Sequence, residues 1–308
     1  MKNLDKVDNV DEINLRDIFS VFWQGKRQIA STTILFFVIS ILYSLFLPNI
    51  FRSEAILATS QKENSLMDSA SLSSLASIAG FNLADSANSE SDKAITIMMS
   101  TSFFEDKIFP NIHLPNLIAD PRWDSKTNTL SYDSNLYDRE RGQWVGGSSN
   151  SQDAIPTVQE AHRYFLNNVL NIKMDNLSGF VTLSIDHASP FIAKKWAELI
   201  INQINDHFRE RDLELALSSI IYLNEQIAMT SVVEVRQALS QLLKNQIKVS
   251  MLTDANKEYV FVELDPPIAP EKKHSPNRKT IVLIGTFLGF FVASLIIFIR
   301  NFAWRDYK

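Results

Sequence analysis

The stretch IASTTILFFVISILYSLFL, residues 29–47, and the stretch TIVLIGTFLGFFVASLIIFI, residues 280–299, decide the fold of this chain. Neither contains a charged residue, and a helix of about 20 residues, rising about 1.5 Å per residue, crosses a hydrocarbon core of about 30 Å. The cations that flank the two stretches are Lys26, Arg27, Lys279 and Arg300. We therefore expect two transmembrane helices surrounded by the lipid bilayer.

The first stretch is expected to be an uncleaved anchor rather than a secretory signal. Its apolar run is too long for a signal, residues 1–28 mix acidic with basic side chains, and no small-x-small cleavage site follows Leu47. Within residues 1–28, helical spacing of apolar residues predicts either a short interfacial helix or a helical lead-in to the span. The residues with this spacing are Leu15, Ile18, Phe19 and Phe22.

The short segments outside the two spans carry Lys and Arg, so both termini are expected in the cytoplasm and the bulk of the chain in the periplasm, as a multi-pass protein of the cell inner membrane. Four cations in the long loop oppose this orientation, but long loops translocate largely regardless of charge. They are Lys272, Lys273, Arg278 and Lys279. The expected cytoplasmic segment, first span, periplasmic domain, second span and cytoplasmic tail are residues 1–28, 29–47, 48–279, 280–299 and 300–308.

Composition argues against several classes of function. The net charge of −5 argues against nucleic acid as a partner, because binding phosphates needs a concentrated basic patch. The absence of cysteine excludes disulfides and thiolate metal sites. No phosphate-binding glycine motif occurs, and the five histidines lack ligand spacing. Acid pairs such as Asp120 with Asp124 lie in polar loop sequence and are interpreted as solvated carboxylates rather than a glycosidase dyad. We expect no catalytic residue, no cofactor, no metal and no enzymatic activity.

Residues 51–188 and 259–264 are expected to form an α/β base. The segments predicted to pair as a mixed sheet are Phe51–Thr59, Asn171–Asp175, Phe180–Asp186 and Tyr259–Leu264. The predicted helices are Asp92–Phe109, which Pro110 ends, and Pro156–Leu170. Between them, residues 120–147 combine Trp and Tyr with Asp, Ser, Asn and Gly, which predicts an elaborated hairpin.

Residues 189–258 are predicted to form a long helical arm. Ser189 and Pro190 begin a helix whose apolar spacing continues to Ile227, and about 40 residues in one helix would extend about 60 Å. Ser231 opens a capping-box pattern, so a second helix is expected to return antiparallel to the first. Such a pair buries little of its own apolar surface, so self-association is expected to cover it.

The middle of the arm is charged nearly all round, as expected where a helix becomes solvated or meets another subunit. The residues proposed for the arm and its contacts between subunits are Arg209, Glu210, Arg211, Asp212 and Ser231. The fold class is therefore an α+β membrane protein in which two transmembrane helices flank a periplasmic α/β base with a long protruding helical hairpin.

Seven short motifs resemble the polysaccharide co-polymerases, also called chain-length determinant (Wzz) proteins. They are DEINLR at 11–16, FWQGK at 22–26, FRERD at 208–212, YLNEQ at 222–226, VRQAL at 235–239, DPPIAPEK at 265–272 and SPNRK at 275–279. They extend over nearly the whole chain. The tail after Ile299 has nine residues, too short for the tyrosine-kinase domain of the capsule-type relatives, so the resemblance points to the O-antigen type.

The resemblance implies a non-catalytic regulator of lipopolysaccharide O-antigen chain length. It implies a bell-shaped homo-oligomeric ring, such as an octamer, working with the integral-membrane O-antigen polymerase that joins repeat units on undecaprenyl diphosphate; contact with that lipid-linked glycan stays open. The insertion at residues 120–147 departs from the family pattern, so details of the base are expected to differ. The alternative function is a periplasmic adaptor of a polysaccharide export system.

Two further groups of residues have a physical role. Prolines in the segment 265–278 lack an amide donor and fix φ, so they either set the height of the base above the bilayer or form a plain rigid linker. They are Pro266, Pro267, Pro270 and Pro276. In the second span, Gly285, Gly289 and Ala293 fall four residues apart, a small-xxx-small pattern that permits close helix packing but also occurs by chance.

Overall fold

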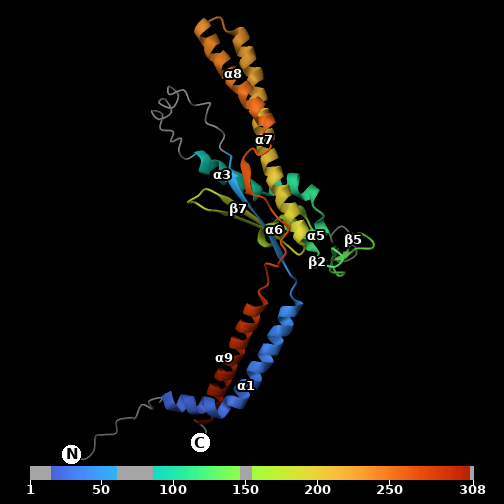
Figure 1. Ribbon diagram of the computed structural model, residues 1–308, viewed down its shortest axis with the longest axis vertical. Helices are drawn as coiled ribbons and strands as arrows, with labels where there is room; N and C mark the ends of the chain where they lie inside the picture. The colour runs from blue at the N-terminus through green and yellow to red at the C-terminus, as the bar shows by residue number, and fades with distance from the viewer. Residues whose placement is uncertain (1–14, 61–85, 146–154, 306–308) are drawn as a thin grey trace, which may run out of the picture. The chain divides into compact units, whose positions relative to one another are not determined.

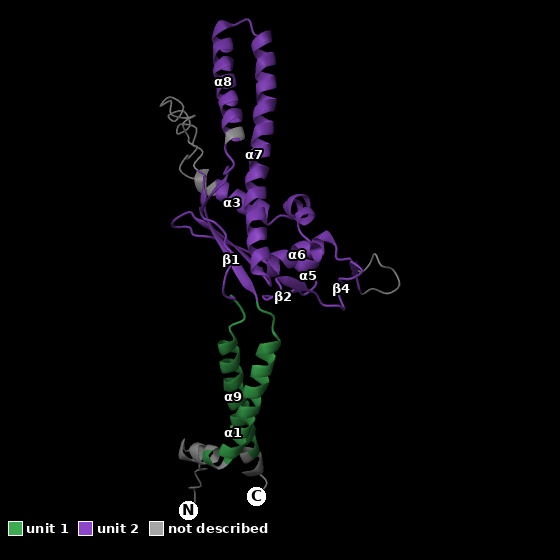
Figure 2. Cartoon of the chain, turned by 45° about the vertical axis from the view of Figure 1, so that its right-hand side comes forward, with its two compact units in different colours: residues 1–49, 274–308 green, residues 50–273 purple. Residues whose placement is uncertain are grey.

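A computed structural model describes residues 15–60, 86–145 and 155–305 (Figure 1). The motif at residues 11–16 lies largely outside these ranges, as do the last two residues of the insertion at 120–147. The chain divides into two compact units, Met1–Asn49 with His274–Lys308, and Ile50–Lys273 (Figure 2). We describe each unit by itself.

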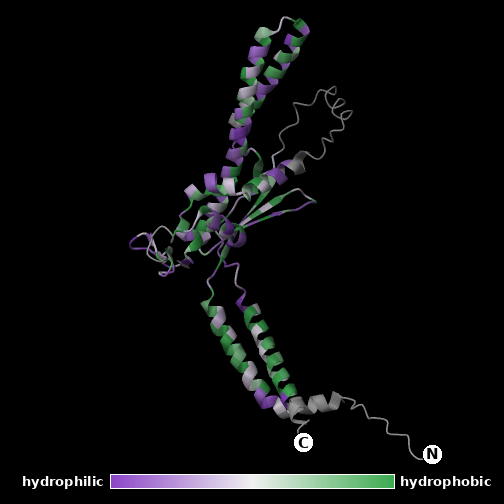
Figure 3. Ribbon diagram, turned by 180° about the vertical axis from the view of Figure 1, so that it is seen from behind, coloured by the Kyte–Doolittle hydropathy of each residue, from purple (hydrophilic) through white to green (hydrophobic). Residues whose placement is uncertain are grey.

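The first unit contains the helices α1 (Leu15–Phe46) and α9 (Arg278–Arg305), which pack side by side (Figure 2). Helix α1 begins at Leu15, so the segment before the first apolar stretch is continuous with the span. The windows Gly25–Phe46 and Arg278–Arg300 have mean hydropathies of 2.1 and 2.7 and hold few buried residues. Figure 3 shows hydrophobic residues along most of the length of both helices. Both are therefore long and apolar enough to cross a membrane.

The second unit contains a four-stranded sheet in the order β6-β7-β1-β8. Its strands are β1 (Phe51–Thr59), β6 (Leu170–Met174), β7 (Val181–His187) and β8 (Phe261–Asp265). All three pairings are antiparallel, so the prediction of a mixed sheet is wrong. Strands β6 and β7 form a hairpin that turns at Gly179, which has φ +73°; β1 then pairs antiparallel with β7, and β8 pairs antiparallel with β1.

One face of the sheet packs on the first half of helix α7 (Pro190–Met229) and forms the core. Along β1 the alternate residues Phe51, Ser53, Ala55 and Leu57 are buried, as the two-residue period of a strand requires. Along α7 the buried residues recur at helical spacing. They include Ala193, Trp196, Ala197, Ile200, Ile201, Ile204 and Phe208. The core therefore positions the base of α7 against the sheet.

The predicted helix Asp92–Phe109 is broken in the structure. It consists of α3 (Ser86–Met98), α4 (Thr101–Phe103), a π-helical turn η3 (Phe104–Ile108) and a 3₁₀ turn η4 (Phe109–Asn111), followed by α5 (Leu114–Ile118). Ser100 causes the break, because its backbone is extended and its side chain accepts a hydrogen bond from the amide of Phe103 at 3.3 Å. Phe103, Phe104 and Ile108 are then all buried.

Helix α6 (Val158–Asn168) is shorter than the predicted Pro156–Leu170. Its N-terminus is fixed by a capping box, in which the Glu160 amide donates to Thr157 Oγ1 at 3.3 Å and the Thr157 amide donates to Glu160 Oε2 at 2.9 Å. This is why the helix starts after Thr157 and not at Pro156.

The aromatic insertion forms two small hairpins, where the sequence predicted one elaborated hairpin. They pair β2 (Arg122–Asp124) with β3 (Thr129–Ser131), and β4 (Tyr137–Asp138) with β5 (Gln143–Trp144). Asn128 and Gly142 adopt positive φ at the turns. Aromatic contacts hold the insertion together: the Tyr137 ring lies 5.5 Å from that of Tyr132 and 5.4 Å from that of Trp144, centroid to centroid.

Helix α8 (Val233–Ala255) returns along the second half of α7 (Figures 1 and 2). The predicted capping box at Ser231 is wrong, because Val232 occupies the N-cap position of α8. Instead, the Arg236 guanidinium closes the turn by donating to the Thr230 carbonyl from Nη2 at 2.6 Å and from Nε at 3.2 Å. This forked hydrogen bond satisfies the Thr230 carbonyl at the C-terminal end of α7, and the Val232 side chain makes no cap bond at the start of α8.

Candidate functional site

Gly285 and Gly289 lie at close contacts between α9 and α1. A Cβ atom added to Gly289 would lie 2.5 Å from Phe36 Cβ, and one added to Gly285 would lie 2.7 Å from Ser40 Cβ. No real side chain fits at these distances unless the helices move apart. The two glycines thus permit a helix separation that any larger residue would prevent.

Ala293 and Gly25 extend this small-residue contact along the helix pair. Ala293 is 2% exposed, and a Cβ on Gly25 would lie 2.5 Å from Ile297 Cδ1. The packing role of Gly25 was missed from the sequence, where it was noted only within the motif at residues 22–26. The signal that could have indicated it is a glycine four residues before the apolar run begins. The first unit therefore has three close approaches along its length.

The charged middle of α7 has partners within the same chain. Arg209 Nη2 donates to Asp206 Oδ1 at 2.7 Å, and Lys107 Nζ donates to Glu210 Oε2 at 2.9 Å. Arg211 donates to Asp212 Oδ1 from Nη2 at 3.0 Å, and its guanidinium lies 4.5 Å from the ring centroid of Phe208. Each of these cations thus pairs with an acidic side chain of the same chain. A contact with a neighbouring subunit would have to compete with these pairs.

Asp212 also joins α7 to the segment that follows α8. Tyr259 donates from its hydroxyl to Asp212 Oδ2 at 2.9 Å, and Thr253 Oγ1 lies 3.3 Å from the same hydroxyl. Tyr259 and Thr253 are buried. The sequence placed Asp212 in a solvated stretch, because nothing in a helical pattern indicates which tyrosine a distant turn will bring to it.

Asn205 holds the start of β8 from within α7. Its Oδ1 accepts hydrogen bonds from the amides of Val260 and Phe261 at 2.9 and 2.8 Å, and its Nδ2 donates to the Phe261 carbonyl at 3.0 Å. The side chain is 4% exposed. A buried amide with three backbone bonds is well satisfied, and it fixes the register between α7 and the edge strand.

His187 is a buried neutral histidine at the end of β7, three residues before α7 begins. Its Nδ1 accepts a hydrogen bond from the Ser189 amide at 2.9 Å, so Nε2 carries the proton and donates to the Asn116 carbonyl at 3.0 Å. Burial lowers the pKa of His187 to about 4, and the bond from Nε2 to the Asn116 carbonyl opposes this shift only in part. Ser189 occupies the N-cap position as predicted, but its side chain makes no cap bond to the described helix.

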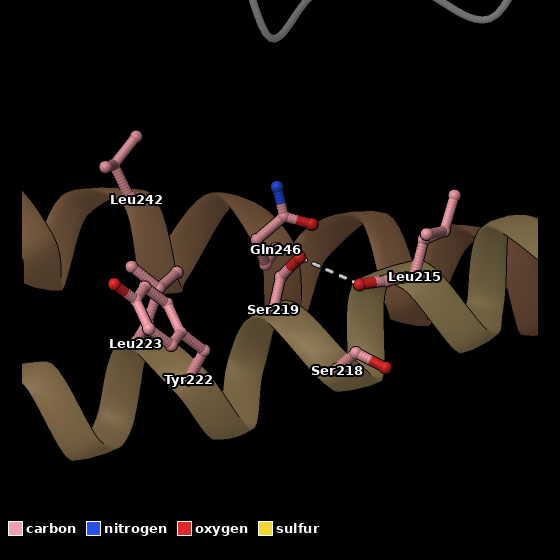
Figure 4. A pocket seen from close by; sticks show the side chains of 7 residues that line it. All are labelled: Leu215, Ser218, Ser219, Tyr222, Leu223, Leu242 and Gln246. Carbon is pink, nitrogen blue, oxygen red and sulfur yellow. Dashed lines mark hydrogen bonds between the residues drawn. The ribbon is translucent and has the colours of Figure 1, made fainter.

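The second half of α7 and α8 present many exposed apolar side chains. Those more than 40% exposed are Leu215, Leu217, Ile221, Tyr222, Met229, Val233, Val235, Leu242, Ile247, Met251 and Leu252. An open hollow of about 420 Å³ lies along the pair, lined from α7 by Leu215, Tyr222 and Leu223 and from α8 by Leu242 and Gln246 (Figure 4). Apolar residues on the surface of a soluble monomer are usually scattered singly, whereas these are grouped along one helix pair.

A side-chain hydrogen bond ties the proline segment to the sheet. Ser53 donates from Oγ to the Ile268 carbonyl at 2.8 Å, from the buried face of β1. Pro267 is buried, whereas Pro266 is exposed and Pro270 is half-buried. Pro276, in the first unit, follows a cis peptide bond. Ser231 is exposed in the turn between α7 and α8.

Within the described residues there is no group of three His, Asp or Glu side chains that could hold a metal ion. The histidines lie apart: Thr101 contacts His162, His207 packs on Phe103, and His113 packs on Tyr137. The candidate surfaces of this chain are therefore its helix contacts and its exposed apolar faces.

Comparison with known proteins gives a partial match. Residues 11–108 match the family model described as "Chain length determinant protein" (Wzz), which confirms the resemblance inferred from the sequence. No curated protein matches the chain. Among solved structures, a full-length bacterial polysaccharide co-polymerase is 13% identical with a TM-score of 0.41, covering 96% of this chain and 99% of its own. A fragment of the co-polymerase WzzB from Salmonella Typhimurium is 11% identical with a TM-score of 0.27, covering 74% and 100%.

Proposed function

We propose, from the match of residues 11–108 to the chain length determinant family, that this chain regulates the length of a surface polysaccharide, the O-antigen of lipopolysaccharide. The match includes the first apolar helix and β1, which is the point where the membrane segment leads into the folded unit. The chain forms no glycosidic bond itself. It biases the point at which a membrane polymerase stops extending the glycan.

The proposed location is the cell inner membrane, with α1 and α9 as the spans and the second unit in the periplasm. The lengths and hydropathies of both helices support spanning. The cations at residues 26, 27, 300 and 305 support cytoplasmic termini. A reporter that is active only in the cytoplasm, inserted after Thr127 in the exposed β2–β3 turn, tests this topology; activity there would contradict it.

The working form is a homo-oligomeric ring. Exposed apolar residues on α7 and α8 support this, because burying each of them against a second copy stabilises the contact by about 25 cal/mol per Å². Identical subunits that repeat one heterologous contact close into a ring when the rotation permits. In such a ring the same weak contact repeats at every interface, so the free energy of association of the whole ring is the sum of many small contributions.

The deciding experiment is deletion of the gene followed by gel analysis of the lipopolysaccharide ladder. Loss of a length regulator leaves polymer of unregulated length, with short chains in excess and no modal cluster. Restoring the intact gene restores the cluster. If deletion eliminates the polymer altogether, the chain is an enzyme or an essential exporter and the proposal fails.

A further inference from the structure

The end of the second unit where β1 begins carries a row of aromatic rings. The Phe51 ring, on the first residue of β1, lies 5.3 Å from the ring of Trp123, centroid to centroid. The Trp123 ring lies 6.1 Å from that of Phe191, which is the second residue of α7 and is 53% exposed. The start of the sheet, the first hairpin of the insertion and the start of the long helix therefore meet through apolar rings.

The second hairpin of the insertion lies at the same end. Asn116 joins it there, because its Oδ1 accepts from the Tyr132 hydroxyl at 2.6 Å and its carbonyl accepts from His187, the register partner of the first residue of β1. Leu136 and Val145 flank this hairpin, are 40% and 44% exposed, and share a backbone hydrogen bond of 2.9 Å. Figure 2 shows β2 and β4 at this end of the second unit. We call the following residues the apolar end: Phe51, Trp123, Leu136, Trp144, Val145 and Phe191.

Net charge does not select a partner for the apolar end. Residues 120–147 contain four Lys and Arg against five Asp and Glu, a net charge of −1. Arg122 and Arg141 also have acidic neighbours within the insertion, Asp120 at 3.5 Å and Asp138 at 3.6 Å. The surface is therefore suited to a partner that it recognises by apolar and aromatic side chains.

The length of the covalent chain limits the distance between the apolar end and the first apolar stretch. Leu47 is the last residue of that stretch, and Phe51 follows four residues later. Four extended residues span at most about 14 Å. If α1 crosses the bilayer, the headgroup layer fills roughly the first 5–8 Å of that distance. This limit comes from the number of residues alone and requires no particular arrangement of the two compact units.

We propose that the apolar end rests on the periplasmic surface of the bilayer, with its exposed side chains among the lipid headgroups. Trp and Tyr are enriched at this depth, because an apolar ring there contacts lipid while its N–H or O–H bonds to water or to a headgroup. The insertion supplies both residue types. The inference rests on the proposed topology and not on the proposed control of polysaccharide length, so the two proposals fail separately.

Spin labelling tests the proposal directly, since the chain has no cysteine of its own. Nitroxides are attached to the single variants Leu136→Cys and Val145→Cys of the full-length protein in phosphatidylcholine nanodiscs. Power saturation compares collisions with oxygen, which concentrates in lipid, and with a water-soluble nickel chelate. We expect an oxygen-to-nickel ratio about fivefold higher at these two sites than at Leu177→Cys, the matched control in the β6–β7 turn, which is 96% exposed. High salt is expected to leave the ratios unchanged, because the insertion is nearly neutral.

Two results of this experiment would overturn the proposal. Equal oxygen-to-nickel ratios at Leu136 and Leu177 would mean that the apolar end faces water. Protection of the Leu136 label from both oxygen and nickel would mean that protein, such as a second copy of the chain, covers this end.

Tryptophan fluorescence gives a second measurement that leaves the exposed apolar residues in place. The background variant W23F/W304F removes the tryptophans next to the two apolar stretches. In nanodiscs of brominated phosphatidylcholine, the quenched fraction of the remaining fluorescence is expected to fall by about half when Trp144→Phe is added to this background. Trp196→Phe is the control; it removes a ring that is 3% exposed in the core, so the quenched fraction is expected to rise. A quenched fraction unchanged by Trp144→Phe would also overturn the proposal.

Discussion

Asn205 and Phe261 form a reciprocal pair of hydrogen bonds between a side chain and a backbone. The Asn205 amide donates to the Phe261 carbonyl at 3.0 Å, and its oxygen accepts from the Phe261 amide at 2.8 Å. The pair joins the long helix α7 to the edge strand β8, which begins 56 residues further along the chain. The pair contributes to the stability of the fold because both groups are buried, and water cannot reach either of them to replace a lost hydrogen bond.

We expect Asn205→Ala to lower the free energy of unfolding by about 3 kcal/mol. The substitution leaves the buried amides of Val260 and Phe261 and one carbonyl without partners, and each unsatisfied group costs about 1–3 kcal/mol before relaxation. Urea denaturation of the purified protein, followed by circular dichroism, measures the change. Asn224→Ala is the control, since that exposed side chain donates only to the Ile220 carbonyl in its own helix. Equal losses for the two variants would contradict the prediction.

His187 predicts a pH dependence of stability. Its pKa is about 4 when folded and about 6.5 when unfolded, so below pH 6.5 the unfolded state binds more protons and stability falls as the pH is lowered. The contribution is complete above pH 6.5 and reaches a loss of about 3 kcal/mol near pH 4. Denaturation measured between pH 4.5 and 7.5 is expected to show this slope in the wild type and a reduced slope in His187→Gln. His274→Gln, at an exposed site, is expected to keep it; a slope unchanged in His187→Gln would exclude His187 as its source.

We expect Gly285→Leu with Gly289→Leu to separate α1 from α9 without unfolding the second unit. The new side chains meet Ser40 and Phe36, and the lost packing is worth about 1–2 kcal/mol. Because the chain has no cysteine, spin labels can be placed at Tyr43 and Ile284, and electron resonance is expected to show a longer and broader distance. Phe291→Leu, on a side chain that is 66% exposed, is the control. An unchanged distance in the double variant would show that the glycines are not needed for contact.

We expect Ile221→Glu to reduce oligomer size in detergent and to shift the modal length of the polysaccharide. The side chain is 64% exposed on α7, and a carboxylate there opposes burial against a second copy. Leu177→Glu makes the same chemical change at a site that is 96% exposed in the β6–β7 turn and is expected to alter neither. Light scattering and the lipopolysaccharide ladder measure the two effects. A normal oligomer and a normal ladder for Ile221→Glu would remove this face from the interface.

Long periodic patterns predicted the large elements well. The apolar spacing after Pro190 extends over eleven turns, and the structure has one helix from Pro190 to Met229. The hairpin between β6 and β7 followed from Ser178 and Gly179 between two strand-like runs. Both elements could be predicted because the sequence patterns that indicate them either repeat along the chain or lie within a few residues of each other.

The predictions of shorter elements failed where side chains near a helix end formed bonds or contacts that the sequence pattern does not indicate. Ser100 sits in an apolar pattern that favours one helix, but its hydroxyl caps a new helix at the Phe103 amide, and tertiary packing then favours a π-helical turn. The capping box expected at Ser231 does not form, because α8 begins one residue later, with Val232 as its N-cap. The contacts of Asp212 with Tyr259 and of Asn205 with Phe261 join residues far apart in sequence, and a single sequence carries no signal for them.

The pairing of β1 with β8 has a mechanical consequence. Phe51 follows the end of α1 by five residues, and Asp265 precedes α9 by thirteen, so the chain enters this ladder and leaves it at the same end. Opposed tension on the two helices would then load the pairs one after another, beginning near Ile56 and Asp265, and not all at once in shear. The bond from Ser53 to Ile268 stands ahead of that first pair. Under such tension the strand pairs would separate in sequence, and the hydrogen bond from the Ser53 hydroxyl to Ile268 would break before them.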